Sequence, residues 1–284
     1  MKYILLLIGG YMFVAGVTLS QHSPKYQRDV IQKGLMGRVK SYTEYTYEPV
    51  KANTGVSYLK YKSLVSFNKQ GNTTAAYLHH SGKLVYQDTC IYDKEGRETR
   101  TTIQPGHIRK SVYSYNSKNN LVEKISSRSV PKFIIIYNRK GYRDTLYSLT
   151  VSGKLNSKVV YHYDSRNNKT EEVQYSANGK MEYKTMYGYD SHNNKVEERR
   201  TSADGKTSYH ILFKYDKRGN IIMKRDSNII YIRGKDGPAK KEDSDVYVRK
   251  FKYDGYDNTG NWLKQTEVLN NKIVRIIKRE FEYY

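Results

Sequence analysis

Residues 163–168 read Tyr-Asp-Ser-Arg-Asn-Asn, and the same pattern returns 26 residues later at 189–194 and again at 215–220. Each copy consists of an aromatic residue, Asp or Asn, two polar residues, Gly or Asn, and often a final Asn. Eight copies occur, and they begin at Phe67, Tyr92, Tyr115, Tyr137, Tyr163, Tyr189, Tyr215 and Tyr256. A pattern that recurs at a nearly fixed period indicates a fold built from structural repeats.

The repeated element has the chemistry of a tight turn. An Asp or Asn side chain at its second position can accept hydrogen bonds from the backbone that follows. Gly or Asn at its fifth position tolerates the left-handed backbone conformation that closes such a turn. A second turn signal lies 16 residues after three of the tyrosines, at Gly153, Gly179 and Gly205. Two turns in each 26-residue unit predict one antiparallel β-hairpin per unit.

The segments before the main turns alternate with a period of two residues. Tyr161, Tyr187 and Phe213 fall on one face, while the intervening positions are mostly Lys, Glu and His. Such alternation is typical of an antiparallel sheet with one covered face and one solvated face. We therefore expect an all-β chain, an antiparallel meander of about 14 to 18 strands whose aromatic face points inward. The sheet must curl or partly close, because open twisted sheets rarely exceed about 10 strands.

The ends of the chain and one insertion stand apart from the repeats. Residues 1–20 combine one Lys, an apolar run and small residues before position 21. This pattern predicts a cleaved signal peptide. We therefore expect an exported protein that is located in the periplasm, on the outer surface or outside the cell. The run is shorter than the ~20 apolar residues that span a bilayer. Residues 21–36 are an N-terminal segment for which a short helix is one option. Residues 37–284 form the expected repeat domain, with a mobile insertion near 226–245.

The charge of the chain is strongly positive. Lys and Arg number 50 against 28 Asp and Glu, so the formal net charge is +22. Such a surface attracts polyanions, although the same residues could simply solubilise a flat sheet and protect its edges. Positive charge is densest in the C-terminal units, where Lys224, Arg225, Arg249 and Lys250 are the candidate polyanion-binding residues. The candidate ligands are an anionic glycan, lipopolysaccharide, or nucleic acid bound without sequence specificity.

No residue pattern indicates catalysis. The single cysteine, Cys90, excludes an internal disulfide and a thiolate zinc site. His79 and His80 lie near Cys90 in sequence, so a Cys–His nucleophile pair or a metal site can be imagined. An ordinary sheet contact is the favoured interpretation, because no third residue at a recognisable spacing would orient the pair. We assign no catalytic, metal or cofactor-binding residue, and we expect a protein that is not an enzyme.

The unit Tyr-Asp-x-x-Gly-Asn at residues 215–220 resembles the YD repeat of RHS and wall-associated proteins. The resemblance covers about residues 37–284, and residues 35–42 and 260–284 are also similar to secreted YD-repeat proteins common in Bacteroidota. In the large RHS, teneurin and toxin-complex proteins, such repeats spiral into a hollow shell around a toxic C-terminal domain. Here the repeats are few, Asn replaces the usual Gly at positions 119, 167 and 193, and we expect no cargo domain after the final strand. The resemblance therefore implies the β-hairpin architecture rather than toxin encapsulation.

Two functions agree with these patterns. The first is a secreted, non-enzymatic binding scaffold of the envelope or the extracellular space, with an anionic glycan or another polyanion as its ligand. The alternative is a structural or partner-protein adaptor whose sheet edge or tyrosine face docks another chain. Retention on heparin that weakens with salt would favour the first, and capture of one defined protein without polyanion affinity would favour the second.

Overall fold

The computed structural model of the protein describes residues 33–50, 57–92, 98–104, 107–115, 121–125, 132–138, 140, 142–205, 207–232 and 240–284. The expected signal peptide lies outside the described residues, as does the expected N-terminal segment up to residue 32. Two of the eight repeated turns, at 92–97 and 115–120, also fall almost wholly outside them.

The described chain consists of eighteen β-strands and their connections, which confirms the all-β prediction. The strands are β1 (Val39–Pro49), β2 (Ser57–Phe67), β3 (Thr73–His80), β4 (Lys83–Tyr92), β5 (Glu98–Gln104), β6 (His107–Tyr115), β7 (Leu121–Ile125), β8 (Lys132–Tyr137), β9 (Arg143–Leu149), β10 (Leu155–Tyr163), β11 (Lys169–Ser176), β12 (Met181–Tyr189), β13 (Lys195–Ser202), β14 (Thr207–Tyr215), β15 (Ile221–Ile232), β16 (Lys240–Tyr256), β17 (Trp262–Leu269) and β18 (Lys272–Tyr283). Within the described ranges, no helix has the length and apolar character needed to cross a membrane.

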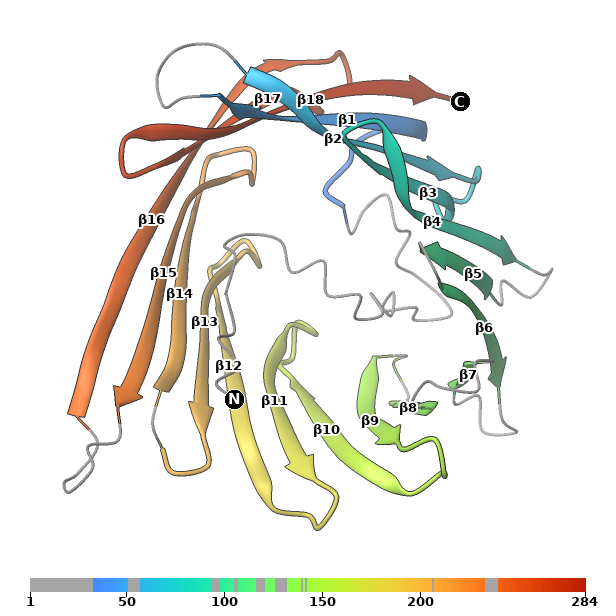
Figure 1. Cartoon of the computed structure of the whole chain (residues 1–284), viewed down its shortest axis with the longest axis vertical. Coiled ribbons are helices and arrows are strands. Elements are labelled where there is room, and N and C mark those ends of the chain that lie inside the picture. The colour runs from blue at the N-terminus through green and yellow to red at the C-terminus, as the bar shows by residue number, and fades with distance from the viewer. Residues whose placement is uncertain are drawn as a thin grey trace.

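All eighteen strands belong to one sheet, in which chain neighbours lie antiparallel (Figure 1). The first strand, β1, pairs with β2 on one side and with the last strand, β18, on the other. The order of strands in the sheet therefore begins at β8, follows the chain to β18, passes to β1 and ends at β7. The two end strands, β7 and β8, lie next to each other. The sheet is curled, as its strand number predicts, and among the described residues no ladder between β7 and β8 closes it into a full ring.

The repeated turns have the geometry that their residue pattern predicts. Asp190 accepts hydrogen bonds at Oδ1 from the backbone amides of His192 and Asn194, both at 2.9 Å, and at Oδ2 from Asn194 Nδ2 at 3.0 Å. Asn193 closes the turn with a φ of 66°, a left-handed conformation that Asn tolerates. The same carboxylate bonds recur at Asp216. The Asp and the final Asn of the repeat thus hold the turn without any ligand.

The leading tyrosine of a repeat joins one unit to the unit before it. Tyr189 Oη donates a hydrogen bond to the backbone carbonyl of Lys169 at 2.9 Å, and Tyr215 Oη does the same to Lys195 at 2.7 Å. Burial raises the pKa of both phenols. Each hydroxyl therefore stays protonated and binds a carbonyl 20 residues earlier, which explains why Tyr rather than Phe leads these repeats.

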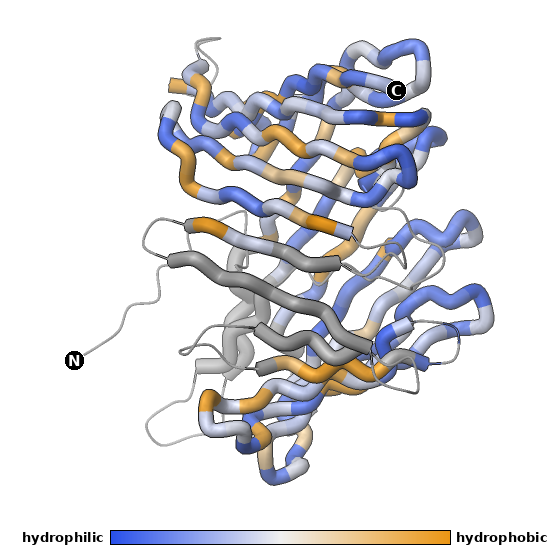
Figure 2. The backbone as a smooth tube through the Cα atoms, turned by 90° about the vertical axis from the view of Figure 1, so that its right-hand side faces the viewer, coloured by the Kyte–Doolittle hydropathy of each residue, from blue (hydrophilic) through white to orange (hydrophobic). Residues whose placement is uncertain are grey.

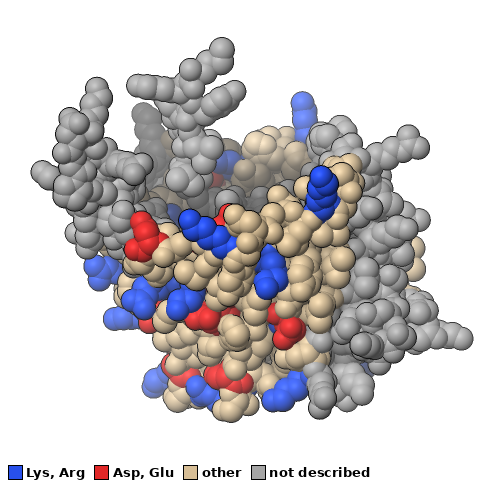
Figure 3. Space-filling view, turned by 90° about the horizontal axis from the view of Figure 1, so that it is seen from below, with Lys and Arg blue, Asp and Glu red and all other residues tan. Residues whose placement is uncertain are grey.

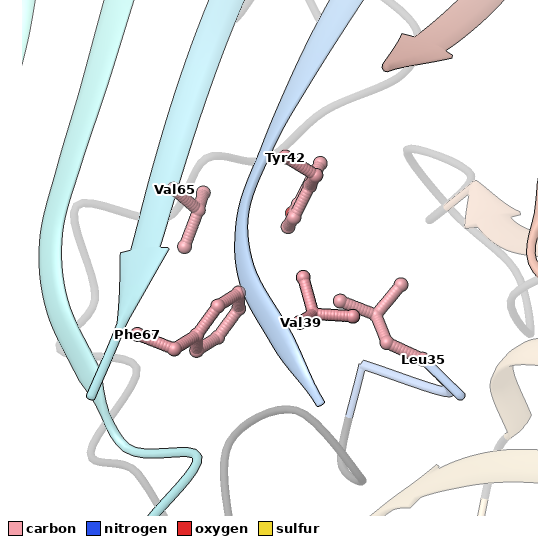
Figure 4. Close-up of a cluster of buried hydrophobic side chains, with 5 residues drawn as sticks. All are labelled: Leu35, Val39, Tyr42, Val65 and Phe67. Atoms are coloured by element: carbon pink, nitrogen blue, oxygen red, sulfur yellow. The ribbon is translucent and has the colours of Figure 1, made fainter. Parts of the chain in front are cut away.

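The two faces of the curled sheet differ in burial. Cross-strand pairing and shared contacts place Tyr161, Tyr187 and Phe213 on one face, as predicted, and we call this the inner face. Most buried side chains lie on it, including Thr185, which is fully buried. Where β1, β2 and β18 meet, the same face holds an apolar cluster of Leu35, Val39, Tyr42, Val65 and Phe67 (Figure 4). Figure 2 shows apolar positions interspersed with polar ones along the strands, whereas many of the hairpin ends are hydrophilic.

The insertion near 226–245 is mostly paired strand. β15 continues to Ile232 and β16 begins at Lys240, with Ile229 opposite Asp243 and Ile232 opposite Lys240. The β-branched residues of this segment favour extended backbone, which corrects the boundaries of the expected mobile tip. The remaining tip, residues 233–239, lies outside the described residues.

Candidate functional site

The four predicted polyanion-binding residues do not form one site. In the ladder between β15 and β16, Lys224 lies opposite Arg249, whereas Arg225 lies opposite Val248 and Lys250 lies opposite Met223. Successive side chains of a strand point to opposite faces of the sheet. Lys224 and Arg249 therefore share the inner face, while Arg225 and Lys250 project from the outer face.

The inner pair is neutralised by carboxylates. Lys224 Nζ lies 2.9 Å from Asp226 Oδ1, and the Arg249 guanidinium pairs both with Asp226 and with Glu267, at 3.2 Å from Nε to Oε1. Arg275 completes the group with an ion pair of 2.8 Å to Glu267, which is buried. These charges satisfy one another in a partly buried network, so this pair is structural rather than a free anion site.

The outer pair belongs to a different cluster that the structure completes with Lys214. Lys214 lies opposite Met223, and Met223 lies opposite Lys250, so the two lysines flank one residue on adjacent strands. Their Cα atoms are about 10 Å apart, since neighbouring strands are about 4.8 Å apart. Lys214, Arg225 and Lys250 are exposed, and none of them forms an ion pair with a carboxylate of the described chain. We call these three residues the outer basic patch.

Elsewhere on the outer face the charges are mixed. Lys184 Nζ lies 3.4 Å from Glu171, and His210 Nε2 lies 2.7 Å from Glu197. Figure 3 shows Lys and Arg side by side with Asp and Glu over the part of the molecule that is lowest in Figure 1. The outer basic patch differs from these ion pairs because its three cations have no carboxylate partners among the described residues.

The inner face carries a ladder of alternating rings and ammonium groups. The aromatic positions were predicted, but the lysines between them were not. From one strand to the next the order is Tyr161, Lys169, Tyr187, Lys195 and Phe213, with distances from ammonium to ring centroid of 5.7, 4.3, 5.5 and 5.0 Å. Each lysine thus lies between two rings, an arrangement that attracts the cation to both π faces. We call these five residues the aromatic–lysine ladder.

Each lysine of the ladder also pairs with a glutamate three residues later. Lys169 Nζ lies 2.8 Å from Glu172, and Lys195 Nζ lies 2.6 Å from Glu198. The register shifts next to Lys169 and Lys195, and this irregularity lets residues three apart share a face. Lys195 and Tyr209 hold the pKa of Glu198 below its usual value even though burial opposes ionisation.

An open pocket of about 480 Å³ lies over this ladder, at the main-turn ends of β10 to β13. Its lining combines four tyrosines with amide and charged groups. The lining residues are Tyr142, Tyr163, Asn167, Asn168, Lys169, Tyr187, Tyr189, Lys195 and Glu198. Burial raises the pKa of Tyr187, so its phenol remains a neutral hydroxyl. The pocket therefore offers ring surfaces, hydrogen-bond donors and two ammonium groups, and no sequence pattern alone singles it out.

The imagined Cys–His pair is not assembled. Cys90 is buried in β4, while His79 lies opposite Leu84 near the other end of the same hairpin. Leu84 and Cys90 are six positions apart in β4, which is about 20 Å of extended chain. His80 instead stacks on Tyr61 with ring centroids 4.8 Å apart. Among the described residues, no group of three or more His, Cys, Asp and Glu side chains could hold a metal ion.

No protein-family model and no curated protein sequence matches the chain. The matches among solved structures include two proteins of weak likeness. A porin-like protein from Bacteroides uniformis superposes with a TM-score of 0.48 at 10% identity, covering 87% of this chain and 99% of that one. The toxin complex TcdB2–TccC3 superposes with a TM-score of 0.21 at 12% identity, covering 76% of this chain and 14% of that one. At such scores and identities, neither likeness carries an argument about this chain.

Proposed function

We propose that the protein is an exported, non-enzymatic scaffold of the YD-repeat type that binds an anionic glycan or another polyanion through the outer basic patch. The observation that carries the proposal is the exposure of Lys214, Arg225 and Lys250 on three consecutive strands without carboxylate partners among the described residues. Cations in such a row can each contact one charge of a linear polyanion and release its counterions.

The rest of the chain supports this function in three ways. The net charge of +22 draws polyanions toward the molecule from a distance. The hairpin turns are held by their own Asp and Asn side chains, so the repeats provide a frame that needs no ligand to fold. The apolar run of residues 1–20 supports export.

The test compares two variants with equal changes of charge. The first is Lys214→Glu, Arg225→Glu and Lys250→Glu together, and the second reverses the exposed turn lysines Lys83, Lys154 and Lys180. We expect the first variant to lose retention on heparin while the second keeps most of it. The affinity for duplex DNA is also measured over a range of salt concentrations. The slope of log affinity against log salt should be shallower in the first variant than in the unmodified protein, by about 0.9 for each phosphate that the variant no longer neutralises.

Equal losses in both variants would show that bulk charge alone attracts the polyanion, and the proposal would be wrong. Far-ultraviolet circular dichroism checks that both variants stay folded. Capture of one defined protein by a chain with no affinity for heparin would favour the adaptor function instead.

A further inference from the structure

The open pocket on the inner face has chemistry that polyanion binding at the outer basic patch does not use. The two sites lie on opposite faces of the sheet and share no residue. From the lining of this pocket we propose that it binds one sugar ring that carries a carboxylate, as in a uronic acid. This inference goes beyond the proposed function, because it assigns a second ligand site with its own specificity.

Aromatic rings supply the apolar part of the site. Tyr142 and Tyr163 form a tilted pair with ring centroids 5.3 Å apart, and both line the pocket. A pyranose ring presents patches of C–H groups that pack on such surfaces, while its hydroxyls need polar partners at the edge. A pocket of about 480 Å³ has the size of ordinary small-molecule sites, which range from about 300 to 1,000 Å³.

The turn at residues 163–168 supplies an amide donor. Asn167 Oδ1 accepts a hydrogen bond from Lys140 Nζ at 3.1 Å, and its Nδ2 has no partner among the described residues. The neighbouring Asn168 differs, because its Nδ2 already donates to Asp164 and to Asn193, both at 3.0 Å. Asn167 is therefore the amide of the lining that can donate to a sugar hydroxyl.

The charges of the lining favour an acidic sugar over a neutral one. Two cations, Lys169 and Lys195, face one carboxylate, Glu198, while Glu172 pairs with Lys169 from outside the lining. An ammonium group has three hydrogen-bond donors, and each of these lysines donates to one glutamate at 2.6 to 2.8 Å. The remaining donors can bind one ligand carboxylate through charge-assisted hydrogen bonds.

The repeat sequence explains why this chemistry occurs here and not in the adjoining units. One repeat later, Ile221 and Lys224 occupy the positions of Lys195 and Glu198, and Phe213 occupies that of Tyr187. One repeat earlier, Arg143 and Leu146 occupy the positions of Lys169 and Glu172. Two consecutive Lys-x-x-Glu strand starts meet only between the units that begin at Tyr163 and Tyr189.

The first experiment measures binding of D-galacturonate and D-galactose to the full chain by titration nuclear magnetic resonance. We expect saturable binding of galacturonate, at least about tenfold tighter than binding of galactose, because only the acid completes the charge-assisted hydrogen bonds. Replacing Lys169 and Glu172 together by Gln keeps the local charge balance, and it should reduce the preference for the acid. Equal affinity for the two sugars, or no binding of either, would overturn the proposal.

The second experiment locates the site. Tyr142→Ala and Asn167→Gly should each weaken galacturonate binding by about fivefold or more, since each removes part of the lining. Tyr175→Ala is the matched control, because that ring lies on the outer face beneath Lys158. Equal weakening by Tyr175→Ala would refute the assignment. Retention of the Tyr142→Ala protein on heparin should be unchanged, and its loss would contradict two separate sites.

Discussion

Replacing Tyr189 or Tyr215 by Phe should lower the free energy of unfolding by about 1 kcal/mol per substitution. Each phenol donates one hydrogen bond to a backbone carbonyl of the preceding unit, at 2.9 Å for Tyr189 and 2.7 Å for Tyr215. Phe keeps the ring and its packing, so the change removes the hydrogen bond alone. A net hydrogen bond contributes about 0.5 to 1.5 kcal/mol, and the two acceptors belong to different units. The double variant should therefore lose about 2 kcal/mol.

Urea unfolding followed by circular dichroism and by the fluorescence of Trp262, the only tryptophan of the chain, measures these changes. Coincident transitions of the two signals would establish a two-state comparison. Tyr175→Phe is the control, because Tyr175 has no hydroxyl hydrogen bond among the described residues, and its effect should stay within about 0.5 kcal/mol. Unchanged stability in the Tyr189 and Tyr215 variants, or an equal loss in the control, would refute the role given to the leading tyrosine.

Three further predictions concern the ion pairs and the pKa shifts. Glu267→Gln should lower the free energy of unfolding, measured in urea, by about 3 kcal/mol, because it leaves Arg249 and Arg275 without their buried partner. Glu282→Gln is the control. Glu282 forms an exposed pair with Lys40, so its replacement should cost less than about 1 kcal/mol. Burial, reinforced by Glu198 in the case of Tyr209, raises the pKa of Tyr209 and Tyr253 to about 12. The folded state therefore keeps protons that the unfolded state loses near pH 10.0, so stability should be full below pH 10.0 and fall as the pH rises toward 12, as measured by urea midpoints. Asn194→Ala should raise the pKa of Asp190, because the hydrogen bond from Asn194 is the largest cause of its lowered value, and carboxyl carbon resonances report the change.

The repeat period predicts most of the fold because each unit encodes its own turns and faces. Asp190, Asn193 and Asn194 form the turn that their types require, and Tyr187 and Phe213 share the face that alternation assigns to them. These features depend on contacts within a unit or between adjoining units. A sequence pattern with a constant period therefore predicts both the turns and the faces of the strands.

The candidate site was harder to predict, because it depends on register and on irregular strand starts. Consecutive residues such as Lys224 and Arg225 must point to opposite faces, so alternation alone contradicts a single stripe made from the four predicted cations. The partners Asp226 and Glu267 follow from the pairing of β15, β16 and β17, where the spacing of the leading aromatics widens to 41 residues and the period is lost. Likewise, the irregular starts of β11 and β13 turn Lys169 and Lys195 inward, which a simple two-residue period does not predict.

Polyanion binding at the outer basic patch is tested most directly by a lysine acetylation footprint, read by mass spectrometry with and without a heparin oligosaccharide. Heparin should protect Lys214 and Lys250 of the patch from acetylation. It should cause no change at Lys224, which pairs with Asp226 on the inner face, or at the exposed turn lysines Lys83, Lys154 and Lys180. Uniform protection of all these lysines, or protection of Lys224 without Lys214 and Lys250, would contradict binding at this patch.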